Sequence, residues 1–556
     1  MSVPVPALTR RRFAALAGLT ALVPVLEACG ASSSAGSAKA AGTPVPGGTA
    51  IFAVNTEPVS WDVHVSSQDI TGELQRNVFD SLIAEDDKGV FHAWLAKSWT
   101  VSPDLKTYTF VLRDDVTFTD GTAFDAQAVK VNFDRIVDPA TKSDLAASLL
   151  GPYTGTTVVD AHTVKVEFSE PFAPFLQAAS TAYLGFYSPA AIAKHGAALG
   201  SGGAADVGTG PFTFTSYTKG ESAVYARNPH YAWPPANAGR SGAAYLDGLT
   251  IRFLAEDATR VGALSSGQVH AARAVPPVDV KTLAANQSIS LVHRDDPGGN
   301  YLIFMNAAKA PFDDIHVRKA VLHGINVAED VQSVYFGQYE RAWSPLSSAT
   351  PDYDASLANT WAYDPTTAGA LLDQAGWTGR DADGYRTKAG TTLSVDWPVL
   401  PAEYITDQRD VLGQAVQADL KKIGIKVTRP APDIGTFIDE VYGGKTDFVD
   451  FSWARFEPDV LWLLFNGAST PSTGGQNATF VNDPDLTAWT NQGRATLDAA
   501  TRKSVYAKVQ QRIIDQAYVV PVYVPQTILG VSGTLHGLEY DPQPWTLFYN
   551  AWLSAA

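Results

Sequence analysis

The stretch Leu95–Ile136, LAKSWTVSPDLKTYTFVLRDDVTFTDGTAFDAQAVKVNFDRI, combines two hydrophobic periodicities. Apolar side chains alternate with polar ones from Tyr108 to Leu112, which predicts a half-buried strand. Further on, apolar residues recur at steps of three and four from Ala126 to Ile136, which predicts an amphipathic helix capped by Asp125. A strand followed by such a helix is typical of a mixed α/β protein.

The same two patterns continue along the chain in both directions. Strands are predicted at 50–54, 163–168, 212–214, 301–305, 425–427 and 518–524, and helices at about 313–324, 412–423 and 505–517. A single core stops growing at roughly 250 to 300 residues, so a chain of 556 residues should form two or more lobes.

Composition and charge limit the possible partners. Apolar residues make up 45 % of the chain and the formal net charge is −16, with no Lys/Arg-rich run after the first dozen residues. Such a chain is globular and repels phosphate backbones, so nucleic acid is not expected as a partner, and a monomer is expected. The charge alone indicates solubility and does not identify a cationic ligand.

The N-terminus has the three-part pattern of a bacterial export signal. Arg10 and Arg11 begin a charged patch that is typical of twin-arginine signals, although an ordinary secretory signal would also accept it. The apolar run 13–26 would extend only about 21 Å as a helix, which is too short for a stable membrane span.

The chain has one cysteine, Cys29, directly after the apolar run, so intramolecular disulfides and cysteine-based zinc sites are excluded. The sequence Leu26-Glu27-Ala28-Cys29 resembles a lipobox, and we expect Cys29 to carry the lipid anchor of an extracytoplasmic protein. Residues 29–48 are rich in Ala, Ser, Gly and Pro and are interpreted as a flexible tether.

Five segments in a fixed order resemble the bacterial extracellular solute-binding proteins of family 5, which include the dipeptide, oligopeptide and nickel binders of ABC importers. Besides 95–136, they are VGTGPFTFTSY from Val207, APFDDIHVRKAVLHGIN from Ala310, LKKIGIKV from Leu420 and YAKVQQRIIDQAYVVPVY from Tyr506. The resemblance implies a ligand cleft that closes between two lobes, and an ABC permease as partner.

The resemblance also implies a discontinuous first lobe. The expected divisions are an export signal at 1–28, a tether at 29–48, lobe I at 49–297 with an inserted subdomain at about 62–205, lobe II at 298–520, and a return to lobe I at 521–556.

Peptide-binding members of the family present a Trp-x-x-Asp segment in lobe II, whose carboxylate pairs with the ligand's α-ammonium. The comparable stretch here, DFSWARFEPD at 450–459, keeps Trp453 but has Phe456 in place of the aspartate. Glu457 or Asp459 could take that role, or it could be missing. Arg455 could bind a carboxylate or phosphate, or pair with one of these two acids.

Trp61 and Tyr404 are further candidates for the cleft, since aromatic surfaces commonly line small-ligand pockets. The expected ligand is a peptide or peptide-like solute. An oligosaccharide, an opine-like conjugate or a nickel complex remains the alternative, as does a chaperone or receptor role for the same cleft. An exported hydrolase is a weaker hypothesis because the sequence contains none of the common catalytic motifs, and neither a cofactor nor a resident metal is expected.

Overall fold

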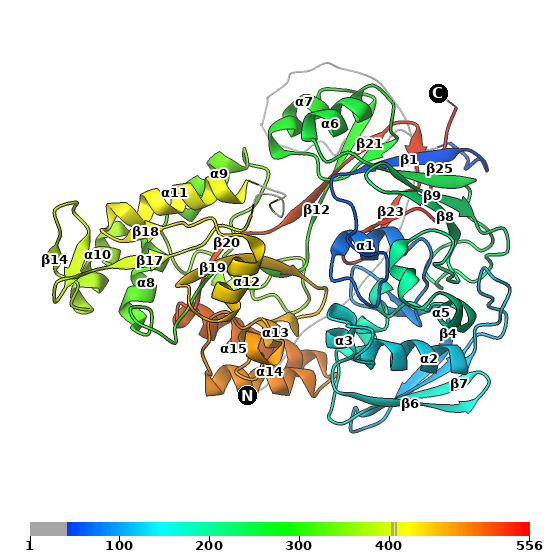
Figure 1. Cartoon of the computed structure of the whole chain (residues 1–556), viewed down its shortest axis with the longest axis horizontal. Coiled ribbons are helices and arrows are strands. Elements are labelled where there is room, and N and C mark those ends of the chain that lie inside the picture. Colours follow the sequence, from blue (N-terminus) through cyan, green and yellow to red (C-terminus); the bar gives the residue numbers. More distant parts are fainter. Residues whose placement is uncertain (1–41, 402–404, 406–407, 556) are drawn as a thin grey trace, which may run out of the picture. The chain divides into compact units, whose positions relative to one another are not determined.

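The computed structural model of the protein describes residues 42–401, 405 and 408–555. Its largest sheet is built around β1 (Thr49–Val54), which pairs in parallel with β10 (Gly248–Phe253) on one side and with β11 (Ala271–Ala272) on the other. The remaining strands are β8 (Phe212–Thr218), β9 (Ser222–Arg227), β12 (Ile289–Asp295) and β21 (Gln526–Ser532). The strand order β12-β21-β11-β1-β10-β9-β8 brings both ends of the described chain into one sheet (Figure 1).

The stretch quoted at the outset folds as its two periodicities predict. Its strand is β5 (Thr107–Leu112), with the alternate side chains fully buried, and its helix is α2 (Ala126–Val137). The carboxylate of Asp125 accepts the Ala128 N–H at 2.9 Å and so caps the helix. Around β5 a four-stranded sheet forms in the order β4-β5-β7-β6, with β4 (Ala96–Val101), β6 (Tyr153–Asp160) and β7 (Thr163–Phe168).

The VGTGP segment connects this four-stranded sheet to β8, and its glycines allow a close backbone approach. The Gly210 N–H donates to Val78 O at 2.8 Å, and the Phe212 N–H donates to Asn77 O at 3.0 Å. A Cβ at Gly208 would lie 2.0 Å from Val78 O, so a larger residue would push the two segments apart. The motif is therefore structural here.

Lobe II contains a three-stranded sheet with β13 (Gly298–Met305) between β19 (Phe448–Ala454) and β20 (Val519–Tyr523). The helices of this lobe are α8 (Ile315–Gly324), α9 (Val327–Val334), α10 (Pro365–Gln374), α11 (Arg409–Lys422), α12 (Ile434–Tyr442), α13 (Val460–Phe465), α14 (Pro484–Arg494) and α15 (Ala499–Asp515). Three of them, α8, α11 and α15, form where the periodicity predicts them, and Asp314 caps α8; the other helices were not predicted. Small strands complete the lobe: β14 (Gly379–Arg380), β15 (Arg386–Lys388), β16 (Thr391–Thr392), β17 (Ser394–Asp396) and β18 (Lys426–Thr428).

Two chain crossings connect the sheets of the lobes. The first lies between β12 and β13, next to Pro297. The second lies between β20 and β21, since β20 pairs with β13 as far as Tyr523 and β21 pairs with β12 from Gln526. The Asp296 N–H donates to Pro525 O at 2.8 Å, so the two crossings are hydrogen-bonded side by side. We use lobe I for residues 43–296 and 525–555, and lobe II for 298–523.

The other elements of lobe I are short. They are α1 (Asp69–Gln75), β2 (Ile83–Glu85), β3 (Phe91–Ala93), α3 (Leu145–Leu150), α4 (Phe175–Ala178), α5 (Pro189–His195), α6 (Asp257–Ser265), α7 (Val280–Ala284), β22 (Leu535–His536), β23 (Glu539–Tyr540), β24 (Thr546–Leu547) and β25 (Trp552–Leu553). One apolar cluster extends from the large sheet to the four-stranded sheet of lobe I, and separate apolar clusters fill lobe II. Among the described residues, no helix is both long and apolar enough to span a bilayer.

Candidate ligand-binding site

A cavity of about 310 Å³ lies between the two lobes, next to the crossings; we call it the interlobe cavity. That volume is at the lower end of the range usual for small-molecule sites, roughly 300 to 1,000 Å³. Lobe I contributes the loop after β1, the start of α1, the segment 273–277 and the segment 525–528, and lobe II contributes residues near α9, α11, β19 and β20. A ligand in this cavity would therefore touch both lobes.

The wall from lobe I carries more negative than positive charge. Asp69 and Asp296 line it together with one guanidinium, that of Arg273. Arg273 is already paired with buried Glu73, with 2.7 Å between Nε and Oε2. Since a single guanidinium faces three carboxyl groups, this wall favours a positively charged partner.

Burial controls the protonation of two of the lining carboxyl groups, those of Asp69 and Asp296. Desolvation raises the pKa of Asp69 to about 6, against the opposing effect of Arg273. Desolvation likewise raises the pKa of Asp296 to about 7, again opposed by Arg273 and by the Thr527 hydroxyl, which donates to Asp296 Oδ1 at 2.9 Å. A cation bound beside them would stabilise their ionised forms.

The wall from lobe II is aromatic. Tyr335, Tyr339 and Tyr523 line it, with ring centroids 4.5 Å apart for the first pair and 4.8 Å apart between Tyr335 and Tyr523. Arg409 lines the same wall, with its guanidinium 4.9 Å from the ring centroid of Tyr301. Aromatic faces bind apolar groups and cations, and a guanidinium donates hydrogen bonds to carboxylates.

Asp296 links the cavity to the crossings. Its backbone N–H donates a hydrogen bond to the carbonyl oxygen of Pro525 in the second crossing, and its side chain lines the cavity. A ligand that pairs with this carboxylate would act directly on the segments about which two lobes can rotate.

The segment predicted to bind ligand, Trp453–Asp459, lies elsewhere in the interface. Trp453 is half-buried against an apolar cluster of lobe II, and Arg455 is 6 % exposed. Glu457 pairs with Arg502, and Asp459 pairs with Arg494 at 3.1 Å. Desolvation raises the pKa of buried Asp459 to about 6. None of these predicted residues is among those that line the interlobe cavity.

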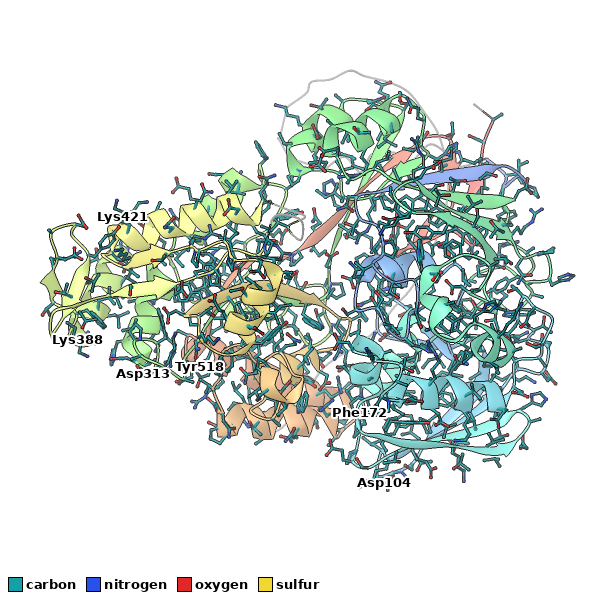
Figure 2. The ribbon with its side chains drawn as sticks, in the orientation of Figure 1. Asp104, Phe172, Asp313, Lys388, Lys421 and Tyr518 are labelled. Atoms are coloured by element: carbon teal, nitrogen blue, oxygen red, sulfur yellow. The ribbon has the colours of Figure 1, made fainter. Side chains whose placement is uncertain are left out.

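This ion-pair network contacts the inserted subdomain. The Ala173 N–H donates to Arg494 O at 2.7 Å, and the Arg494 guanidinium lies 5.0 Å from the ring centroid of Phe172. Figure 2 labels Phe172 at the edge of lobe I that meets the end of α14. The acids of this segment therefore hold a protein contact between the lobes, and their ligand role stays a prediction.

The structure places the other predicted residues as follows. Trp61 is 1 % exposed and packs in the core of lobe I, with ring centroids 4.7 Å from Phe214 and 5.1 Å from Tyr217, so its surface is used by packing. Tyr404 lies outside the described residues, as do Cys29, Arg10 and Arg11.

Sequence reasoning missed the residues that line the cavity. One signal was present: Asp295-Asp296 directly precedes Pro297, where the first crossing was predicted, and an acid at a crossing lies next to the cleft. Asp69, Arg273 and Tyr339 carried no such signal. They come from segments that only the fold brings together.

A two-lobed α/β body joined by two crossings, with a cavity lined from both lobes, defines the class of proteins that enclose a small solute between lobes. The described residues contain no group of three His, Cys, Asp or Glu side chains arranged to hold a metal ion. The charged and aromatic side chains that line the interlobe cavity are carboxyl groups, the guanidinium groups of Arg273 and Arg409, and tyrosines.

Comparison with known proteins identifies the family. Residues 90–474 match the profile of the bacterial extracellular solute-binding proteins, family 5, and the chain belongs to this family. It is 28 % identical to the glutathione-binding protein GsiB of Escherichia coli (strain K12) and, equally, to that of Shigella dysenteriae serotype 1 (strain Sd197), over 90 % of this chain and 94 % of each relative.

Solved structures share the fold. NikA from Brucella suis, in complex with Fe(III)-EDTA, matches with a TM-score of 0.79 at 22 % identity, over 91 % of this chain and 100 % of that one. DppA from Helicobacter pylori, in complex with the peptide STSA, matches with a TM-score of 0.76 at 22 % identity, over 92 % and 98 % of the two chains. These structures confirm the predicted two-lobed fold, and the profile match over residues 90–474 confirms the predicted family.

Proposed function

We propose that this protein is the substrate-binding component of an ABC importer, which captures a peptide or peptide-like solute in the interlobe cavity and delivers it to the permease. The observation that carries the proposal is the cavity itself, since both lobes line it and it adjoins the crossings. A ligand that touches both walls favours the closed arrangement by its higher affinity for it, and no bond is made or broken.

The walls suit a zwitterion. An α-ammonium group would lie beside Asp69 and Asp296, a carboxylate would face Arg409, and the ligand's side chains would rest on the tyrosines. Glutathione and short peptides carry these groups, and glutathione is the ligand named for the relatives that match at 28 % identity. The ammonium partner would then come from lobe I, in place of the aspartate that lobe II lacks at Phe456.

A thermal-shift screen tests the proposal. The probes are reduced glutathione, the dipeptide Met-Leu, a neutral disaccharide and a nickel–histidine complex, each with residues 43–556. Preferential binding to the folded state raises the unfolding temperature. We expect stabilisation by an ammonium-bearing probe with that probe recovered unchanged. Stabilisation by the disaccharide alone would contradict the proposed ligand class, and chemical conversion of the probe would contradict a pure binding role.

We further propose that the protein is held at the outer face of the cell membrane by a lipid on Cys29, after export under the Arg10-Arg11 signal. The sequence around the single cysteine supports this, and residues 29–48 would form the tether. We expect Cys29→Ser to release the protein from the membrane fraction, as judged by fractionation and immunoblotting. Unchanged membrane attachment of that variant would contradict the anchor.

A further inference from the structure

A second cavity, of about 440 Å³, lies inside lobe I; we call it the lobe I cavity. Its lining comes from the stretch 76–94, from residues 177–181 and 211–238, and from the C-terminal segment 539–549. Every described residue that lines it belongs to lobe I, and it shares no lining residue with the interlobe cavity. A molecule could occupy it without closure of the lobes.

The lining of the lobe I cavity is strongly acidic. Six carboxyl groups and three cationic side chains line it: Asp80, Glu85, Asp86, Asp87, Glu539 and Asp541 against Arg76, Lys88 and Arg294. One of the cations, Arg294, is paired with Asp87 at 2.9 Å. The guanidinium of Arg76 donates to neutral oxygens, Ser81 Oγ at 2.7 Å and Ser180 O at 2.6 Å. The carboxyl groups outnumber the cations, but desolvation raises the pKa of Asp80 and Asp541 to about 7 and that of Glu85 well above its ordinary value. A cation bound beside these three groups would stabilise their ionised forms.

Glu85 lines this cavity and, in the part of the chain that the structure describes, has an acceptor atom without a partner. Its Oε2 atom is buried and has no hydrogen-bond partner among the described residues. An unsatisfied buried oxygen is costly, so a ligand that donates to it gains more than the same contact would give in water. This atom points to a ligand with an N–H group or a positive charge.

Aromatic rings form a further part of the lining. They are Trp94, Tyr231, Tyr540, Trp545, Phe548 and Tyr549. The protein's own cations already lie over some of them: Arg76 is 5.2 Å from the ring centroid of Trp94, and Arg294 is 5.1 Å from that of Tyr540. Ring faces combined with nearby carboxyl groups are the usual way in which proteins recognise organic ammonium ions.

We propose that the lobe I cavity is a second ligand site, which binds a small organic cation with an amine or quaternary ammonium group. The cation rests among the aromatic rings, with Glu85 and Asp541 nearby, in a cavity that shares no lining residue with the interlobe cavity. It gives one chain two ligands, one that requires both lobes and one that requires lobe I alone.

The test uses choline and its uncharged isostere 3,3-dimethyl-1-butanol as probes, with the whole mature chain and isothermal titration calorimetry. We expect choline to bind and the isostere to bind at least about tenfold more weakly, because only choline carries the charge. Glu85→Gln keeps the side-chain shape, and we expect it to weaken choline binding by about tenfold. Equal binding of the two probes, or full affinity in Glu85→Gln, would overturn the proposal.

A matched variant separates this site from the interlobe cavity. Asp296→Asn removes a carboxylate from the interlobe cavity only, so choline affinity should stay unchanged. Loss of choline binding in Asp296→Asn together with normal binding in Glu85→Gln would place the cation between the lobes and overturn the proposal. Because peptide binding is measured separately, a failure here leaves the proposed function intact. Unfolding temperatures of both variants check that each is folded.

Discussion

The interlobe cavity and the segment Trp453–Asp459 lie in the same interface, but their carboxyl groups differ in how they are paired with arginines. On the lobe I wall of the cavity, Asp69 and Asp296 share one guanidinium with buried Glu73, so this wall has more carboxyl groups than cations. In the segment, Glu457 is paired with Arg502 and Asp459 with Arg494. An acidic residue in a cleft can therefore either stabilise the contact between the lobes or bind a ligand. The side chains with which it pairs distinguish these two roles.

The largest effect we expect is on stability, at Asp459. Replacing it by alanine leaves the guanidinium of Arg494 buried without its carboxylate, which should lower the free energy of unfolding by about 3 kcal/mol. Urea denaturation measures this change. Affinity for a peptide probe should stay within about twofold of the parent.

Asp485→Ala is the matched control for that variant. Asp485 is an exposed carboxylate 3.5 Å from Arg512, so its loss should cost less than about 0.5 kcal/mol. If Asp459→Ala instead keeps full stability and loses affinity for the peptide probe, the segment binds ligand. That result would contradict a structural role for Asp459.

The next effect is on affinity, at Asp69. Asp69→Asn should weaken the binding of an ammonium-bearing probe such as glutathione by about 2 kcal/mol, roughly thirtyfold, because a charged hydrogen bond is lost. Calorimetry measures the dissociation constant. The control is Asp257→Asn, at the rim of the same cavity, where the carboxylate is paired with Arg260 and affinity should change little. Equal losses in the two variants would show that general charge, and not Asp69, attracts the ligand.

The pH dependence of binding follows from the raised pKa values. Asp69, with a pKa of about 6, and Asp296, with a pKa of about 7, are protonated at pH 5 and ionised at pH 8. Only the ionised forms attract an ammonium group, so affinity should rise by about tenfold between pH 5 and pH 8. The rise should be smaller in Asp69→Asn. An affinity that falls over this range would contradict an ammonium in the cavity.

The smallest effect we expect is at Trp453. Trp453→Phe keeps an aromatic ring against the apolar cluster of lobe II, so affinity for the same probe should change by less than about threefold. Fluorescence or calorimetric titration measures it. A loss of affinity of more than about tenfold would show that the Trp453 indole contacts the ligand, as the family resemblance predicts.

Much of the fold could be predicted because its signals are local. The alternation at 107–112 and the spacing from Ala126 to Ile136 each lie within a dozen residues, and both elements form where expected. The sequence alone does not locate the second crossing, because Pro521 to Tyr523 reads as one apolar strand whichever sheet it joins. Only the pairing with β13 decides that.

The site could not be predicted in the same way. Asp69, Arg273 and Tyr339 are separated by up to 270 residues, and nothing in their local sequence marks them as neighbours. Conversely, the pairing of Asp459 with Arg494 joins the start of α13 and the end of α14 across a contact that no local pattern reveals. Sequence identifies the acids, but the fold assigns their partners, and those partners decide which acids are available to a ligand.

The most direct test of the account measures the distance between the lobes. Spin labels would be placed at Val278 of lobe I and Val411 of lobe II, which are 56 % and 48 % exposed, in a Cys29→Ser background that removes the single native thiol. Double electron–electron resonance would measure the distance between the two labels with and without a saturating peptide probe. We predict a shorter and narrower distribution when the probe is bound. An unchanged distribution at saturation would contradict capture of the solute between the lobes.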